Sequence, residues 1–142
     1  MQATLFTDGG ARGNPGPAGI GYVLSLEDGR EFRAGHYLGE ATNNQAEYKA
    51  LLAGLQRAQR ERVDELLCRL DSELVVKQLS GEYRVKDLDL KPLFEQVNAL
   101  VPSFLKVSFE HVPREENAEA DGLVNEAIDA AVGKKKAPLA RG

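Results

Sequence analysis

The first forty residues contain short apolar runs that are separated by turn signals. Residues Thr4–Thr7 and Ala18–Leu26 are rich in apolar and β-branched side chains, which is typical of strands. Asp28-Gly29 is a strong hairpin signal, and Glu31–Leu38 reads as a further strand. Three consecutive strands with short connections predict an antiparallel meander.

The spacing of apolar residues then changes to that of a helix, which we expect from Thr42 to about Arg60. Thr42 and Gln45 fit the capping-box pattern at its start. Glu47 falls on or beside the apolar face, where a charge is costly unless it is paired or bound to a metal ion. The alternative is a glutamate at the edge of that face, with its carboxylate in solvent.

A fourth strand is predicted at Glu65–Leu70, and it leads directly into Asp71. Ser72 is a candidate cap for a short helix that ends near Ser80. Because a helix separates the third and fourth strands, the connection is a crossover, and the fourth strand should lie parallel to the first. Asp8 and Asp71 would then share the sheet edge at which open α/β sheets bind ligands.

The last third of the chain predicts a helix, a strand and a final helix. The helix covers Leu88–Leu100, and the strand covers Leu105–Val112 with alternating apolar and polar residues. His111 continues the apolar face of that strand. The final helix extends to about Val132 and places Asp121 on or near its apolar face.

Length and composition are those of one domain. We expect residues 1–132 to form the domain and residues 133–142 to be a disordered, weakly basic tail. The net charge of −4 gives no global basic signature, although it permits a local basic groove. Cys68 is the only cysteine, which excludes a disulfide framework or a cysteine zinc site. No signal peptide or membrane-spanning stretch is recognisable, so we expect a cytoplasmic protein. We also expect a monomer.

The segment that follows the first strand is rich in glycine. Asp8–Gly16 reads Asp-Gly-Gly-Ala-Arg-Gly-Asn-Pro-Gly, and its glycines permit close approach of the backbone to a ligand. It has no lysine followed by serine or threonine, so it is not the phosphate loop of nucleoside triphosphatases. We expect the strand to stop at Asp8. Taken alone, this residue could simply start a turn.

Four acids are expected to gather at one edge of the sheet. Two follow parallel strands, and two lie on helix faces that should pack on the sheet. Ionised carboxylates do not cluster without a cation between them, and oxygen ligands suit Mg²⁺ or Mn²⁺. A pair of such ions can clamp the attacking and leaving oxygens of a phosphoryl displacement. The pattern therefore predicts metal-dependent phosphoryl chemistry by Asp8, Glu47, Asp71 and Asp121.

Four segments, in order, resemble the signature segments of type 1 ribonuclease H: Asp8–Gly16, Thr42–Glu47, Asp71-Ser72 and His111–Asp121. The resemblance covers residues 1 to about 132. It implies an α/β, ribonuclease H-like fold: a five-stranded mixed sheet of order 3-2-1-4-5 flanked by helices. It also implies endonucleolytic cleavage of the RNA strand of an RNA–DNA hybrid with two divalent ions, Mg²⁺ or Mn²⁺, which leaves 5′-phosphate and 3′-hydroxyl ends. The family's four acids match the same four residues.

The resemblance also implies contacts with the hybrid. The segment from Gly9 to Asn14 should lie against the RNA strand, and amides beside glycine can reach the 2′-hydroxyls that distinguish RNA. For the two asparagines at the start of the first helix, simple helix capping is the alternative. The candidate contact residues are Gly9, Gly10, Ala11, Arg12, Asn14, Asn43, Asn44, Arg84 and Lys86, with Lys77 as a further phosphate contact.

The chain departs from the family at two places. Many members carry a basic helix and loop with tryptophan, whereas only residues 83–91 fill that region here, and no hybrid-binding domain precedes Asp8. Both differences predict weak substrate affinity rather than altered chemistry. The family often has a mobile histidine ten residues before its last acid. His111 has that spacing and is a candidate catalytic residue on this resemblance. The alternative is that its place on the apolar face makes it a packed structural residue, with Arg114 serving the scissile phosphate instead.

Two rival functions remain open at this point. One is a structure-selective DNA nuclease that uses the same carboxylates. The other is a hybrid-binding module without useful turnover, against which the intact set of four acids argues.

Overall fold

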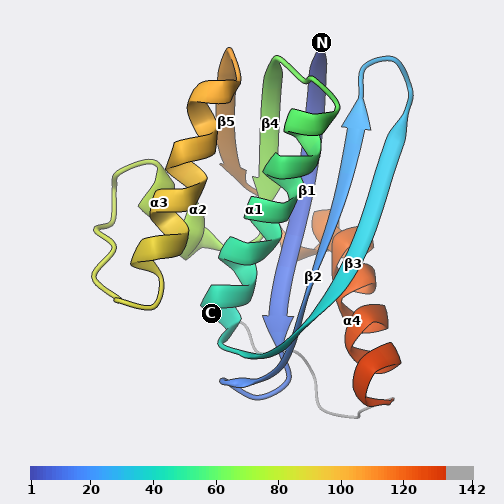
Figure 1. Cartoon of the computed structure of the whole chain (residues 1–142), viewed down its shortest axis with the longest axis vertical. Helices are drawn as coiled ribbons and strands as arrows, with labels where there is room; N and C mark the ends of the chain where they lie inside the picture. Colours follow the sequence, from blue (N-terminus) through green and yellow to red (C-terminus); the bar gives the residue numbers. More distant parts are fainter. Residues whose placement is uncertain (134–142) are drawn as a thin grey trace.

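The computed structural model describes residues 1–133 and is built on one five-stranded sheet. The strand order is β3-β2-β1-β4-β5, in which β1 pairs antiparallel with β2 and parallel with β4 (Figure 1). The expected mixed sheet of order 3-2-1-4-5 is therefore confirmed. The strands are β1 (Gln2–Ala11), β2 (Gly16–Leu26), β3 (Glu31–Ala41), β4 (Glu65–Leu70) and β5 (Lys106–His111).

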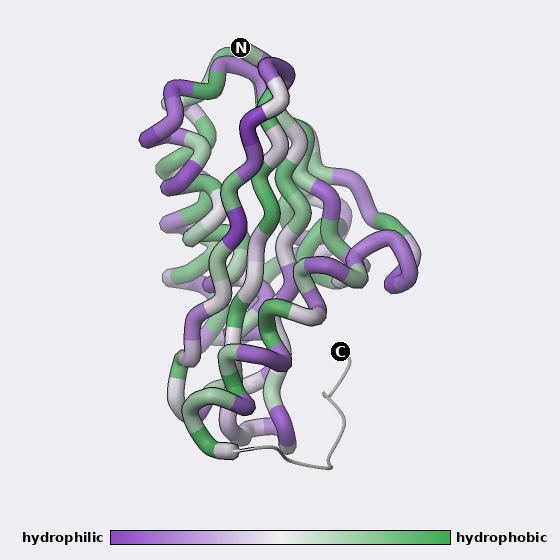
Figure 2. The backbone as a smooth tube through the Cα atoms, turned by 90° about the vertical axis from the view of Figure 1, so that its right-hand side faces the viewer, coloured by the Kyte–Doolittle hydropathy of each residue, from purple (hydrophilic) through white to green (hydrophobic). Residues whose placement is uncertain are grey.

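Helices cover both faces of the sheet. The long helix α1 crosses one face with α2 and α3 beside it, while α4 lies against β2 and β3 on the other face (Figure 1). Apolar residues follow the strands through the middle of the molecule, whereas hydrophilic residues gather in the outlying loops (Figure 2). The helices are α1 (Asn43–Arg60), α2 (Glu73–Leu79), α3 (Lys91–Leu100) and α4 (Ala118–Val132), with short 3-10 helices η1 (Val101–Ser103) and η2 (Arg114–Asn117).

Local signals in the sequence fix where α1 and α2 begin. The capping box of α1 is formed: the Gln45 amide donates to Thr42 Oγ1 at 3.2 Å, and the Thr42 amide donates to Gln45 Oε1 at 2.8 Å. Ser72 caps α2 as expected, since its Oγ accepts from the Val75 amide. Both predicted caps are confirmed.

The core lies between the sheet and α1. Leu5 of β1 and Leu51 and Leu55 of α1 are fully buried there. Cys68 is also buried, and burial raises the pKa of its thiol. Among the described residues, no helix is both long and apolar enough to cross a membrane.

The prediction that the first strand stops at Asp8 is wrong. Strand β1 continues to Ala11, and Asp8 lies opposite Gly21 of β2. The glycines are needed for packing: a Cβ on Gly9 would lie 2.2 Å from the Ala46 carbonyl oxygen of α1. Pairing of β1 with β4 does end at Thr7, so Asp8 and Asp71 meet at one sheet edge as predicted.

The last strand and the helix before it also differ from expectation. Leu105 lies outside β5 and is 83% exposed, and His111 at the end of β5 is exposed too, so the predicted packing of both is wrong. The reason is that β5 is an edge strand, of which only the middle, Val107 and Phe109, packs against the core. Helix α3 begins at Lys91 rather than at Leu88, with a proline in its first turn. The predicted tail lies outside the described residues from 134 onwards.

Candidate metal centre

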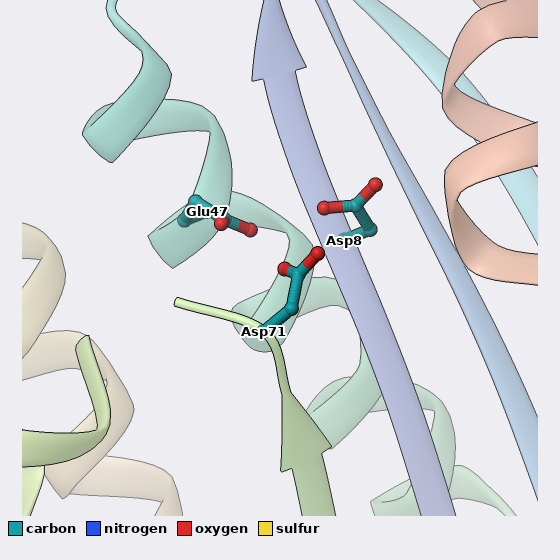
Figure 3. A group of neighbouring side chains, drawn as sticks. All are labelled: Asp8, Glu47 and Asp71. Atoms are coloured by element: carbon teal, nitrogen blue, oxygen red, sulfur yellow. The ribbon is translucent and has the colours of Figure 1, made fainter. Parts of the chain in front are cut away.

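Three acids from three different elements meet at the edge of the sheet (Figure 3). Asp8 comes from β1, Glu47 from α1, and Asp71 directly follows β4. One carboxylate oxygen of each lies within 4.8 Å of the others. Asp8 and Glu47 are buried and Asp71 is half-buried.

The close approach of α1 to β1 holds Glu47 in place. Because Gly9 has no side chain, the first turns of α1 lie directly on the backbone of β1. The Gly9 amide donates a hydrogen bond to Glu47 Oε1 at 2.9 Å. A buried, charge-assisted bond of this kind orients the carboxylate towards Asp8 and Asp71.

The donor set fits a divalent cation. All three ligands are carboxylate oxygens, which Mg²⁺ and Mn²⁺ prefer, and three acids at such separations repel one another unless a cation lies between them. In addition, Asp71 Oδ1 is buried and accepts no hydrogen bond from the residues that the structure describes. Asp8, Glu47 and Asp71 could therefore hold a metal ion.

Asp121, the fourth predicted acid, lies on α4 and is not part of this group of three. Its helix is joined to the site by Asn117, whose Nδ2 donates to the Thr7 carbonyl oxygen at 2.8 Å. Thr7 directly precedes Asp8, so this bond fixes the beginning of α4 beside the metal centre. Sequence reasoning missed Asn117, because its position at the start of a helix predicts a local cap rather than a bond across 110 residues.

The two candidates for assisting groups both lie on the surface. His111 ends β5, and Arg114 lies in η2; both side chains are exposed. The Val112 amide donates to the Leu70 carbonyl oxygen at 2.9 Å, which fixes this segment next to the residue that precedes Asp71. His111 is therefore a surface residue near the acids and not the packed residue that its alternation predicted.

The residues of the glycine-rich segment have different environments. Gly9, Gly10 and Ala11 are buried within β1, whereas Asn14 is exposed. Asn14 Oδ1 accepts a hydrogen bond from the Asn43 amide at 2.8 Å, which joins this turn to the first residue of α1. The buried Asn43 and half-buried Asn44 thus lie beside Asn14, so three predicted contacts are brought together.

The Arg12 side chain points away from the surface. It is 6% exposed, and its Nη1 lies 2.7 Å from Asp129 Oδ1 of α4. Its Nη2 also donates to Asn125 Oδ1 at 3.1 Å. The guanidinium of Arg12 is therefore directed to α4. It does not face the solvent, as the prediction of a phosphate contact requires.

Exposed cations lie in the segment that follows α2. Arg84 and Lys86, together with Tyr83 and the acidic Glu82, line a shallow pocket next to Leu74 of α2. Lys77 lies 5.1 Å from the centre of the Tyr83 ring and forms an ion pair with Glu73 at 3.0 Å. Since α2 directly follows Asp71, these cations lie on the Asp71 side of the sheet edge.

Comparisons with known proteins identify the family and agree with the fold. The family described as reverse transcriptase-like matches residues 6–127. The crystal structure of RNase H1 from the archaeon Halobacterium salinarum superposes with a TM-score of 0.88 at 44% identity, over 92% of this chain and 99% of that one. LC11-RNase H1, solved in complex with an RNA/DNA hybrid, superposes with a TM-score of 0.86 at 47% identity, over 92% and 99% of the two chains.

Some curated relatives are longer than this chain. The bifunctional protein Rv2228c of Mycobacterium tuberculosis is 45% identical over 133 residues, which are 92% of this chain but 36% of that protein. This chain thus spans little more than a third of the length of that relative. The family match and the two structures show that the chain belongs to the type 1 ribonuclease H family, within the reverse transcriptase-like class.

Proposed function

We propose that this chain is an endoribonuclease that hydrolyses the RNA strand of RNA–DNA hybrids and leaves 5′-phosphate and 3′-hydroxyl ends. The convergence of Asp8, Glu47 and Asp71 is the observation that carries the proposal. The likeness to LC11-RNase H1, which was solved with an RNA/DNA hybrid, supports the substrate class.

The proposed cofactors are two divalent ions, Mg²⁺ or Mn²⁺, bound by Asp8, Glu47, Asp71 and Asp121. When bound, they supply an activated water and stabilise the leaving 3′ oxygen. The chain keeps its carboxylates in place before any ion arrives. The Gly9 amide orients Glu47, and the bond from Asn117 to Thr7 fixes α4 beside β1. Such preorganisation reduces the rearrangement needed during the reaction.

Recognition of RNA is assigned to the polar groups around the start of α1. Asn14 is exposed and is bonded to the backbone of Asn43, so its position is fixed relative to the acids. Amide and backbone groups here can bond the 2′-hydroxyls of the RNA strand. Since the residues from Gly9 to Arg12 are buried, contact with the strand would come from the exposed turn that follows them, beginning with Gly13.

The exposed cations have separate proposed roles. Arg84 and Lys86 would bind backbone phosphates, which orients the hybrid without reading its sequence. Arg114 would stabilise charge at the scissile phosphate, and His111 could carry a proton to or from the reacting oxygens. We expect a cytoplasmic monomer that acts on hybrids formed in replication and repair.

The test is cleavage of a labelled RNA–DNA hybrid with Mg²⁺ or Mn²⁺, beside matched all-DNA and all-RNA duplexes. The proposal predicts cuts in the RNA strand of the hybrid. Hydrolysis of the DNA duplex alone would instead identify a DNA nuclease. Tight binding of the hybrid without cleavage would identify a binding module.

A further inference from the structure

A row of polar contacts connects Asp121 to the end of β1. Asn125 lies one turn after Asp121 on α4, and its Nδ2 donates to the Asp121 carbonyl oxygen at 3.1 Å and to Asp121 Oδ2 at 3.4 Å. Its Oδ1 accepts from Arg12 Nη2 at 3.1 Å. Because a guanidinium only donates hydrogen bonds, the amide oxygen must face Arg12, and the amide nitrogen is directed at Asp121.

Arg12 is itself a fixed anchor. Its side chain is almost fully buried and forms the 2.7 Å ion pair with Asp129, one turn beyond Asn125. Its backbone amide donates to the Pro17 carbonyl oxygen at 2.8 Å, directly after β1 ends. The ion pair fixes the guanidinium of Arg12, and the backbone bond fixes the start of its side chain. Because the guanidinium stays charged and only donates hydrogen bonds, it keeps the Asn125 amide in one orientation.

The contacts place Asp121 between two hydrogen bonds that join α4, or the residue directly before it, to β1 or to the residue directly after it. Asn117, four residues earlier, bonds the backbone of Thr7, and Asn125, four residues later, bonds Arg12. Asp121 and Asn125 are four apart and lie on one face of α4, so the face that carries Asp121 is the one that is hydrogen-bonded to Arg12, directly after the strand of Asp8. Both bonds join residues more than 100 positions apart in the sequence.

We propose that Asn125 is a positioning residue that orients the Asp121 carboxylate for a divalent cation, with Arg12 and Asp129 holding the Asn125 amide. The inference rests on the proposed function, because it takes Asp121 to be a metal ligand. Groups that bond a metal ligand fix its orientation, and their loss typically lowers metal affinity or activity about 10–100-fold. Arg12 thereby acts on the metal centre through Asn125, and its side chain is not a phosphate contact.

The decisive variant is Asn125→Ala at a half-buried position. It removes the hydrogen bond from Arg12 and the hydrogen bonds to Asp121. Binding of Mn²⁺ is measured by calorimetry without nucleic acid, and hybrid cleavage is measured as a function of Mg²⁺ concentration. We expect the Mn²⁺ dissociation constant and the Mg²⁺ concentration for half-maximal cleavage each to rise about 10-fold.

A matched control separates positioning from stability. Ile128→Val removes one buried methyl group from the same helix, three residues from Asn125. It should lower the melting temperature and leave the Mn²⁺ affinity unchanged. If Ile128→Val weakened Mn²⁺ binding as much as Asn125→Ala, the effect would be one of stability, and the positioning role would be overturned.

A double variant tests whether Asn125 acts through Asp121. In an Asp121→Asn background, Asn125→Ala should not weaken Mn²⁺ binding further, because the carboxylate that it orients is gone. Wild-type Mn²⁺ affinity in Asn125→Ala, or an equal loss in both backgrounds, would overturn the positioning role alone. Wild-type affinity and cleavage in Asp121→Asn would overturn the metal role of Asp121 and this inference with it, while Asp8→Asn would still test the proposed function.

Discussion

At the scale of single residues, the structure changes what is expected of His111. Its alternation on β5 predicted a packed residue, but it is exposed and close to the end of β4. Alternation along a strand shows which residues lie on the same face of the sheet. It does not show whether a helix covers that face at the end of an edge strand. The reason for assigning His111 a structural role has therefore gone, whereas the proposed role of Arg114 is unaffected.

We expect His111→Ala to leave the melting temperature unchanged and to lower turnover, because an exposed histidine contributes little to packing but can transfer protons. Positioned proton transfer typically contributes about 10²–10⁴-fold to rate. Arg114→Ala should also lower turnover without unfolding. Turnover and melting temperature of both variants test this. A lower melting temperature with normal turnover in His111→Ala would restore the structural role.

At the scale of elements, glycine sets how closely the helices approach the sheet. A Cβ on Gly9 would meet the backbone of α1, and a Cβ on Gly21 would lie 2.5 Å from the Ala120 carbonyl oxygen of α4. Gly9 thus brings the helix that carries Glu47 onto β1, and Gly21 brings the helix that carries Asp121 onto β2, directly opposite Asp8. The glycines are visible in the sequence, but the helix residues that pack against them lie far along the chain. The segment Asp8–Gly16 therefore looks like a turn in the sequence.

Gly9→Ala should therefore displace α1, weaken the metal centre and lower the free energy of unfolding by about 1–3 kcal/mol or more, as overpacking does. Gly122→Ala is the matched control, because a Cβ there meets nothing within 4 Å on the helix α4. It should raise the free energy of unfolding by about 0.5–1 kcal/mol. Urea unfolding measures both changes, and equal stability of Gly9→Ala and wild type would contradict the packing account.

Much of the site was predictable because its signals are local. The acids that follow the apolar runs Thr4–Thr7 and Glu65–Leu70 indicate Asp8 and Asp71, and helical spacing after the cap at Thr42 indicates Glu47. The supporting residues were not predictable in this way. Asn117, Arg12 and Asn125 are polar residues whose partners lie more than 100 residues away, and no period or spacing in the sequence indicates such bonds.

At the scale of the whole molecule, positive charge on the surface is sparse. The net charge is −4, and the segment that carries Arg84 and Lys86 also carries Glu82, Asp87 and Asp89. The chain has no tryptophan and no long basic extension between α2 and α3. Few phosphates can therefore be neutralised, which predicts weak binding of the hybrid with a shallow dependence on salt.

Replacing Arg84 and Lys86 by alanine should raise the Michaelis constant and make its dependence on salt shallower, because each lost phosphate contact lowers both affinity and slope. Arg60→Ala with Lys106→Ala is a control of equal charge, since both residues are exposed at the opposite end of the strands. Steady-state cleavage at several salt concentrations measures the effect. An unchanged Michaelis constant in the first pair would exclude this loop from the binding surface.

The central claim is that the carboxylate cluster binds the metal ions that cleave RNA in a hybrid. The most direct measurement is the initial rate of hybrid cleavage at saturating Mg²⁺ for wild type and Asp71→Asn, with urea unfolding of both without metal. We predict that the variant loses cleavage and is as stable as wild type or slightly more so, because one of three mutually repelling charges is removed. Cleavage by Asp71→Asn near the wild-type rate would contradict the account.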